Sequence, residues 1–172
     1  RKVTASRIKT YAGGASTIGA LDDVTMDATN FTDGLLIQTN SDGSAPTTGT
    51  LSSSSGSIGI GKNVMAALTS GSYNVIIGHE AGDTVTSGGN NIFLGGHAGG
   101  SHTTGTRCVV VGGFAYGNAD TENDNVGLGH NVLNATIAGG EQNVAIGSYA
   151  LDALTSADNN TAVGYGAGTG ST

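Results

Sequence analysis

The sequence contains one cysteine, Cys108, one proline, Pro46, and no tryptophan. A single cysteine cannot form an intrachain disulfide, so a disulfide-stabilised fold is excluded. One proline and the lack of a strict Gly-X-Y period exclude Pro/Gly low-complexity sequence and collagen. Aromatic residues make up only 5% of the chain, whereas 31 of its 172 residues are glycine. Because few side chains are large, the composition favours a thin core with many ordered turns.

Basic residues are also scarce. Four of the six lie within the first nine positions, so beyond them only Lys62 and Arg107 face all thirteen acidic residues, and the formal net charge of the chain is −7. We therefore expect no binding to nucleic acid or to anionic membranes. No segment approaches the roughly eighteen apolar residues of a membrane span, and no targeting signal is recognisable. The start at Arg1 without methionine suggests a processed or truncated chain.

A short apolar tract that ends in glycine recurs seven times. Successive glycines are 17 residues apart except for one interval of 18, whose extra residue we place within 138–142. Asparagine precedes the glycine by four positions in five copies. The glycines are Gly61, Gly78, Gly95, Gly112, Gly129, Gly147 and Gly164. The asparagines are Asn74, Asn91, Asn125, Asn143 and Asn160.

The repeat predicts an all-β fold, a β-solenoid or parallel β-roll of seven coils of about 17 residues. Each tract is β-branched and too short for a helix, and the glycine allows a sharp corner after it. We expect two short strands and two turns per coil, and asparagine amides that stack along the coils or cap turns. Gly105, in a presumed outer turn, should tolerate alanine better than Gly112 tolerates valine. The thin core predicts an oligomer.

The chain divides into two parts. Residues 57–172 form the repeat domain, and residues 1–56 are interpreted as an N-terminal attachment or connector module with a linker. The linker is the segment 41–57, which is rich in serine, glycine and threonine.

No catalytic residue, metal ligand set or cofactor site is expected. Of the histidines, His79 and His130 share one position of the repeat but lie three coils apart, roughly 14 Å at the spacing of neighbouring strands. A three-fold axis could still gather three copies of one histidine. The remaining two histidines, His97 and His102, add no zinc-like spacing. The acidic run 120–125 lacks the glycine and the terminal glutamate of an EF-hand loop.

Enzymatic chemistry is also disfavoured. Cys108 stands where sibling repeats have asparagine, so we interpret it as a structural substitution, and no G-x-S-x-G motif is present. A glycan-cleaving role for Asp120, Glu122 and Asp124 is the weak enzymatic alternative, because no facing acids form a cleft. A column of threonines (Thr69, Thr86, Thr103, Thr155 and Thr172) lacks the T-x-T pairs of an ice-binding face.

The tracts 143–147 (NVAIG) and 160–164 (NTAVG) resemble the repeats of YadA-like trimeric adhesin heads and of phage tail-fibre shafts. This resemblance implies a left-handed parallel β-roll and a homotrimer, intertwined or side by side, whose apolar strands face the three-fold axis. Many adhesin repeats are shorter than 17 residues, which implies longer outer loops here. The segments 20–25 (ALDDVT) and 31–37 (FTDGLLI) resemble short segments that precede the shafts of phage fibre proteins.

The expected function is that of a structural virion protein, a trimeric phage tail-fibre or appendage segment for host attachment. Its expected partners are two further copies of itself, other virion proteins through the N-terminal module, and a receptor on the host surface. A bacterial trimeric adhesin head on the cell surface and a capsid decoration protein are the alternatives. A flanking coiled coil with a membrane anchor would favour the adhesin, and a particle-attachment or chaperone domain would favour the fibre.

Overall fold

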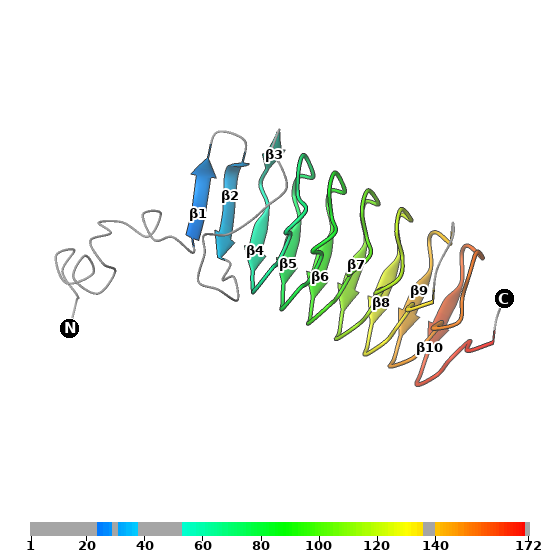
Figure 1. Ribbon diagram of the computed structural model, residues 1–172. Helices are drawn as coiled ribbons and strands as arrows, with labels where there is room; N and C mark the ends of the chain where they lie inside the picture. The colour runs from blue at the N-terminus through cyan, green and yellow to red at the C-terminus, as the bar shows by residue number, and fades with distance from the viewer. Residues whose placement is uncertain (1–23, 29–30, 38–52, 136–139, 171–172) are drawn as a thin grey trace, which may run out of the picture.

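The computed structural model describes residues 24–28, 31–37, 53–135 and 140–170 (Figure 1). These residues contain no helix, and therefore none that could cross a membrane. The strands are β1 (Val24–Ala28), β2 (Phe31–Ile37), β3 (Ser54–Ser55), β4 (Ile58–Ile60), β5 (Val75–Ile77), β6 (Ile92–Leu94), β7 (Val109–Val111), β8 (Val126–Leu128), β9 (Val144–Ile146) and β10 (Thr161–Val163). The predicted all-β class is confirmed.

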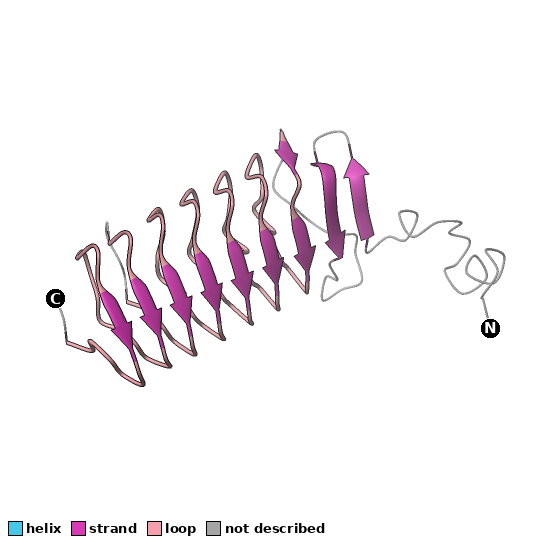
Figure 2. Ribbon diagram, turned by 180° about the vertical axis from the view of Figure 1, so that it is seen from behind, coloured by secondary structure: helices cyan, strands magenta, loops and turns pink. Residues whose placement is uncertain are grey.

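The seven repeat strands, β4 to β10, lie side by side in chain order in one parallel sheet (Figures 1 and 2). Between β5 and β6, Ile76 pairs with Phe93, which is 17 positions further on. Between β8 and β9 the offset is 18, with Val126 opposite Val144. The chain thus makes one turn per repeat, as predicted for a β-solenoid. The extra residue lies between Leu133 and Gly140, because hydrogen bonds on either side keep the regular register.

Each coil contains one three-residue strand, whereas the sequence predicts two. The reason is the backbone conformation of the turns. Residues with positive φ recur at three positions of the repeat: immediately before the asparagine position, and two and four residues after the corner glycine. A left-handed residue bends the chain away from the extended direction, so a second strand cannot continue through these positions. The turns still bond to the next coil, for example from the Thr86 N–H to the Thr103 carbonyl at 2.9 Å.

Each of the seven repeat glycines directly follows its strand and has φ between 128° and 146°. Residues with a Cβ rarely adopt this conformation. Space is a second restriction, because a Cβ on Gly112 would overlap the carbonyl oxygen of Gly129 in the next coil. The corner therefore needs glycine for two independent reasons, one torsional and one steric.

The apolar core lies inside the coils. The middle residue of a strand points inward and meets residues that follow the corner glycine by three, four or seven positions. Ile76, Ala81, Val85, Phe93 and Ala98 are all completely buried within the single chain. Much of the apolar surface that remains exposed in the single chain lies on the outside of the strands.

The chain before the first repeat extends the sheet. β1 pairs antiparallel with β2, and β2 pairs in parallel with β4, where the buried Leu36 lies opposite Gly59. β3 also pairs with β2, and the Ser54 hydroxyl donates to the Gly71 carbonyl at 2.5 Å. The coil register therefore begins before residue 57. Segments 1–23 and 38–52, which hold most of the predicted connector and linker, lie outside the described residues.

Candidate functional site: the outer face of the strands

The outer face of the strands is apolar from β4 to β9, and on β10 Thr161 is its one polar residue. In a strand, alternate side chains point to opposite faces, so the first and third residues of each three-residue strand point away from the core. The first-position column is Ile58, Val75, Ile92, Val109, Val126, Val144 and Thr161. The third-position column is Ile60, Ile77, Leu94, Val111, Leu128, Ile146 and Val163.

This outer face, defined by those two columns, carries no charged side chain. Isoleucines that are 37–39% exposed recur from β4 to β9, and Val163 on β10 is 68% exposed. Scattered apolar residues are normal on a protein surface, but a contiguous apolar face marks an interaction site. The columns repeat at the strand spacing of about 4.8 Å, so the face is an apolar ribbon that runs along the solenoid axis.

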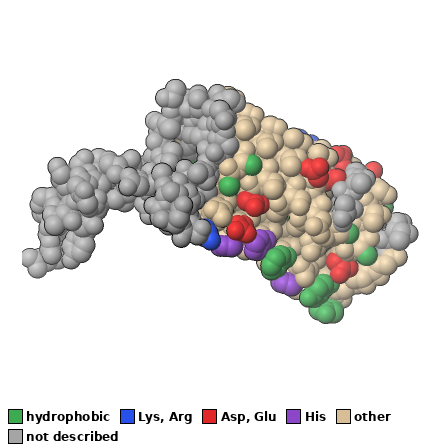
Figure 3. Space-filling model, in the orientation of Figure 1, with side chains coloured by type: hydrophobic (Ala, Val, Ile, Leu, Met, Phe, Trp, Pro, Cys, Tyr) green, Lys and Arg blue, Asp and Glu red, His purple; other side chains and the backbone are tan. Residues whose placement is uncertain are grey.

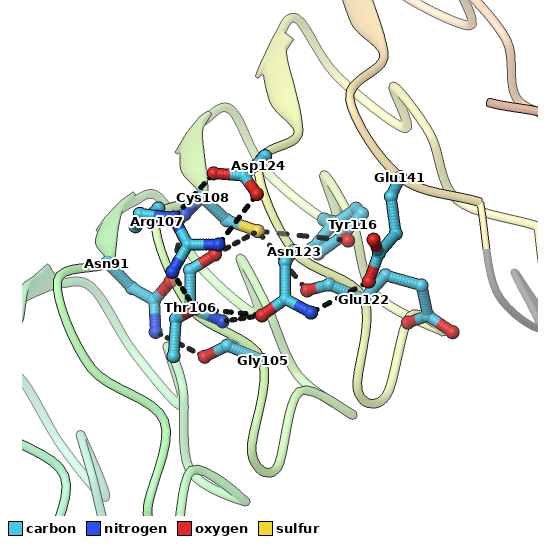
Figure 4. Close-up of polar contacts among 10 residues, drawn as sticks. All are labelled: Asn91, Gly105, Thr106, Arg107, Cys108, Tyr116, Glu122, Asn123, Asp124 and Glu141. Carbon is cyan, nitrogen blue, oxygen red and sulfur yellow. Dashed lines mark hydrogen bonds and ion pairs between the residues drawn. The ribbon is translucent and has the colours of Figure 1, made fainter. Parts of the chain in front are cut away.

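The asparagines that precede the strands form a hydrogen-bonded column along the coils. The Asn91 side chain donates to the Gly105 carbonyl at 3.0 Å and accepts the Cys108 N–H at 3.0 Å (Figure 4). Asn74, Asn125 and Asn143 likewise donate to a turn and accept an N–H from the next coil. Each of these amides therefore binds a carbonyl in the last turn of its own coil and positions the backbone directly before the next strand.

Cys108 occupies one position of this column. It is completely buried, and its thiol lies 3.5 Å from the Glu122 carbonyl and 3.9 Å from the Tyr116 hydroxyl (Figure 4). Burial raises the pKa of this thiol above its usual value, which disfavours the reactive thiolate. Burial also raises the pKa of Tyr116. The thiol donates to the Glu122 carbonyl and the Tyr116 hydroxyl, this hydroxyl also accepts from the Asn125 amide, and the buried environment does not activate a nucleophile.

The acidic run 120–125 uses its carboxylates within the protein. Arg107 donates to both oxygens of Asp124 at 2.6 and 2.7 Å, which lowers the pKa of that carboxyl (Figure 4). The Glu122 carboxylate is buried and accepts the N–H groups of Asp120 and Thr121. Such donors compete with a calcium ion for the same oxygens.

Three hydroxyls of the threonine column bond to the next coil, whereas Thr155 is exposed. Thr69 and Thr86 donate to carbonyls of the next coil at 2.9 and 3.1 Å. Thr103 also donates to the Asp120 carboxylate. These hydroxyls support the stacking of the coils. Thr172 lies outside the part of the chain that the structure describes.

The four histidines occupy three different environments. His102 is buried inside its coil, and His130 lies on the surface. His79 and His97 lie together on adjacent coils, with ring centroids 5.3 Å apart and Glu80 beside both. The sequence prediction missed this pair because it compared histidines only at the same repeat position. A spacing of 18 residues, one repeat plus one, is the signal that would have found it.

Histidine and hydrophobic side chains follow one another along one edge of the coils (Figure 3), and the ring contacts form a row there. Neighbouring ring centroids are 4.8 to 6.1 Å apart. In chain order the row contains His79, His97, Phe114, His130, Tyr149 and Tyr165. These rings extend the exposed apolar and aromatic surface around the corner from the outer face.

Comparisons of the chain with protein families, curated proteins and solved structures gave no match.

Proposed function

We propose that this chain is a structural protein, a stiff segment of a trimeric virion fibre or appendage whose three copies join through the outer faces of their strands. The apolar outer face carries this proposal. Fourteen side chains in two columns point away from the buried core, and Thr161 is the only polar one among them. Leaving such a ribbon in water forgoes roughly 25 cal/mol for every Å² of apolar surface that a partner could cover.

A second copy of the same chain is the occupant that fits this face best. The face is uncharged and presents an aliphatic pair at every level from β4 to β9. A partner must therefore offer apolar side chains at the same repeat spacing, and another copy aligned along the same axis does so at every coil. Interfaces between identical chains are commonly this apolar.

Three copies and a virion location follow from the resemblance to fibre and adhesin repeats. In those families the apolar strand faces a three-fold axis. The segment before the repeats supports a fibre, because β2 (Phe31–Ile37) coincides with the segment that resembles fibre proteins and continues directly into the parallel sheet. Such a rod would be connected to the particle through the N-terminal ends of its three chains.

Light scattering on the full chain tests the assembly. We expect three times the chain mass of 16.8 kDa. A stable monomer at micromolar concentration would contradict an assembly through the outer face, and a dimer would contradict the three-fold arrangement. Detection of the chain in purified virions tests the location, and its recovery instead from a bacterial cell surface would support the adhesin alternative.

A further inference from the structure

We propose that His79, Glu80 and His97 form a binding site for a divalent transition-metal ion, of which Zn²⁺ is the best-fitting representative. The three residues come from the corners of two adjacent coils of one chain. One nitrogen of each imidazole and one carboxylate oxygen all lie within 4.8 Å of one another. Sequence spacing had led us to expect no metal site, and stacking of the coils creates this one.

The distances fit a tetrahedral ion after small side-chain movements. Zn²⁺ binds histidine nitrogen and carboxylate oxygen at about 2.0–2.2 Å, which places the ligand atoms roughly 3.3–3.5 Å apart. His97 Nδ1 lies 3.4 Å from Glu80 Oε2, and His79 Nε2 lies 3.8 Å from Glu80 Oε1. The His79 side chain is 50% exposed. Its ring is therefore free to turn toward the other two ligands, whose atoms lie within 4.8 Å and have to approach by up to about 1.3 Å to reach tetrahedral spacing.

Neighbouring residues hold two of the three ligands in place. The His97 ring stacks on Phe114, with centroids 4.8 Å apart and an angle of 10° between the planes. The Asn63 amide donates to Glu80 Oε1 at 3.3 Å. Ligands that are oriented by partners of this kind bind a metal more tightly than free side chains, because less rotamer freedom is lost on binding.

Charges of both signs lie near the cluster: the carboxylates of Glu80 and Asp83 attract a cation, whereas Lys62, at the repeat position of His79 one coil earlier, opposes it. Asp83 lines the same surface hollow as His97, of about 270 Å³. Burial raises the pKa of the Asp83 carboxyl, and the nearby Glu80 carboxylate adds to the rise, while His97 opposes it. The Asp83 and Glu80 carboxylates thus repel each other, and a bound dication would offset that repulsion.

The ligand types select the class of metal. Two imidazoles and one carboxylate suit zinc and its transition-metal neighbours, with one position left for water. Calcium and magnesium prefer six or more oxygen ligands, which this cluster does not offer. Because all three ligands belong to one chain, the site does not depend on the trimer.

Calorimetric titration of ZnCl₂ into the full, tag-free and chelator-treated chain tests the site. We expect one zinc ion per chain. The test variants are His79→Ser, Glu80→Gln and His97→Asn. Sibling coils have Ser148 at the position of His79, and Asn63 and Asn131 at the position of His97, so the histidine substitutions use residues that the fold already accepts there.

Each variant should lower the zinc affinity at least about 100-fold, since loss of even an outer-shell partner often costs 10- to 100-fold. The matched control is His130→Ser, which removes an exposed histidine from the same repeat position as His79 and should leave the affinity within about twofold. Calcium at about 1 mM should not displace the zinc. Co²⁺ bound to the wild-type chain should show visible absorption bands that His97→Asn abolishes.

Absence of zinc binding would overturn the proposal. So would an equal loss of affinity in His130→Ser and His97→Asn, which would mean binding by scattered surface histidines. If circular dichroism shows that a variant is unfolded, the site is tested instead by NMR on the wild-type chain. Zinc-induced shifts confined to the ring signals of His79 and His97 support the site, and equal shifts at His130 contradict it.

Discussion

The side-chain oxygen of Asn74 accepts the backbone N–H of Asn91 at 3.0 Å. Each asparagine therefore positions the backbone of the next coil, and the column transmits the repeat register from one level to the next. Both residues are completely buried. A buried polar group that loses its partner costs more than the hydrogen bond itself contributes, so the column should be sensitive to substitution.

Asn91→Ala should lower the free energy of unfolding by about 2–4 kcal/mol, because it leaves the Gly105 carbonyl and the Cys108 N–H without their partner. Thermal and urea unfolding monitored by circular dichroism would measure the loss. Asn118→Ala is the control. Asn118 is exposed and donates to the Asn134 carbonyl on the surface, so its loss should cost no more than about 0.5 kcal/mol. Equal effects of the two variants would contradict a structural column.

Gly112→Val should destabilise the coil by more than about 3 kcal/mol, because it combines a forbidden φ of 142° with overlap of the Gly129 carbonyl. Its neighbour provides the control, since a Cβ on Gly113 would meet only His130 Cδ2 at 3.7 Å and Gly96 O at 3.9 Å. Thermal unfolding of Gly113→Ala should be close to that of the wild type. If Gly112→Val unfolded at the same temperature as the wild type, the assignment of Gly112 to a strand-ending corner would be wrong.

The structure places Gly105 in a tight, buried turn and not in the outer turn presumed from the sequence. This glycine is buried, and a Cβ there would overlap the Glu122 carbonyl and the His102 ring. Gly105→Ala should therefore destabilise the protein clearly more than Gly113→Ala does in the same melting experiment. The turn is tight because coils stack at the strand spacing on this side as well.

Ile77→Lys should break the proposed trimer without unfolding the coil. The Ile77 side chain points outward and is 37% exposed in the single chain, so the fold itself tolerates a charge there. In a trimer the ammonium group would be buried without a partner, at a cost of about 3 kcal/mol or more per chain. Light scattering should show the monomer mass. The control is Ser87→Lys, which adds the same charge at an exposed turn and should remain trimeric. If both variants were trimers, the proposed interface would be contradicted.

His102 should make stability depend on pH. Among the described residues neither ring nitrogen has a hydrogen-bond partner, and burial lowers the pKa of the imidazole despite the nearby Gly105 backbone and the Glu122 and Asp120 carboxylates. The unfolded chain, with the ordinary histidine pKa of about 6.5, then takes up a proton before the folded chain does. The contribution of the neutral His102 to stability is therefore fully present above that pH and is lost progressively as the pH falls below it.

His102→Leu should remove this loss, which amounts to at most about 2 kcal/mol at pH 5. Leucine fills the same position in two sibling coils, as Leu68 and Leu154, and both are buried. The measurement is the unfolding free energy of wild type and variant at pH 7.5 and pH 5. The difference between the two proteins should widen in acid, and a constant difference would contradict the titration of His102.

The sequence by itself determined the coil. The 17-residue spacing of glycine and asparagine predicts the stacking register, because in a solenoid each residue pairs with its own counterpart one repeat away. The same reasoning placed Cys108 in the asparagine column. These inferences needed only the period and the conformational preferences of single residue types.

Only the tertiary structure decided which residues of different repeat positions meet. His79 and His97 follow their corner glycines by one and two positions, and the stacked coils bring both rings to the same edge, which a spacing rule for identical positions does not capture. Side-chain volumes within one coil likewise decide which core residues are buried and how tightly Gly105 is packed. They also leave the ring nitrogens of His102 without a hydrogen-bond partner among the described residues. Periodicity determines the path of the backbone, whereas packing inside and between the coils determines what each side chain touches.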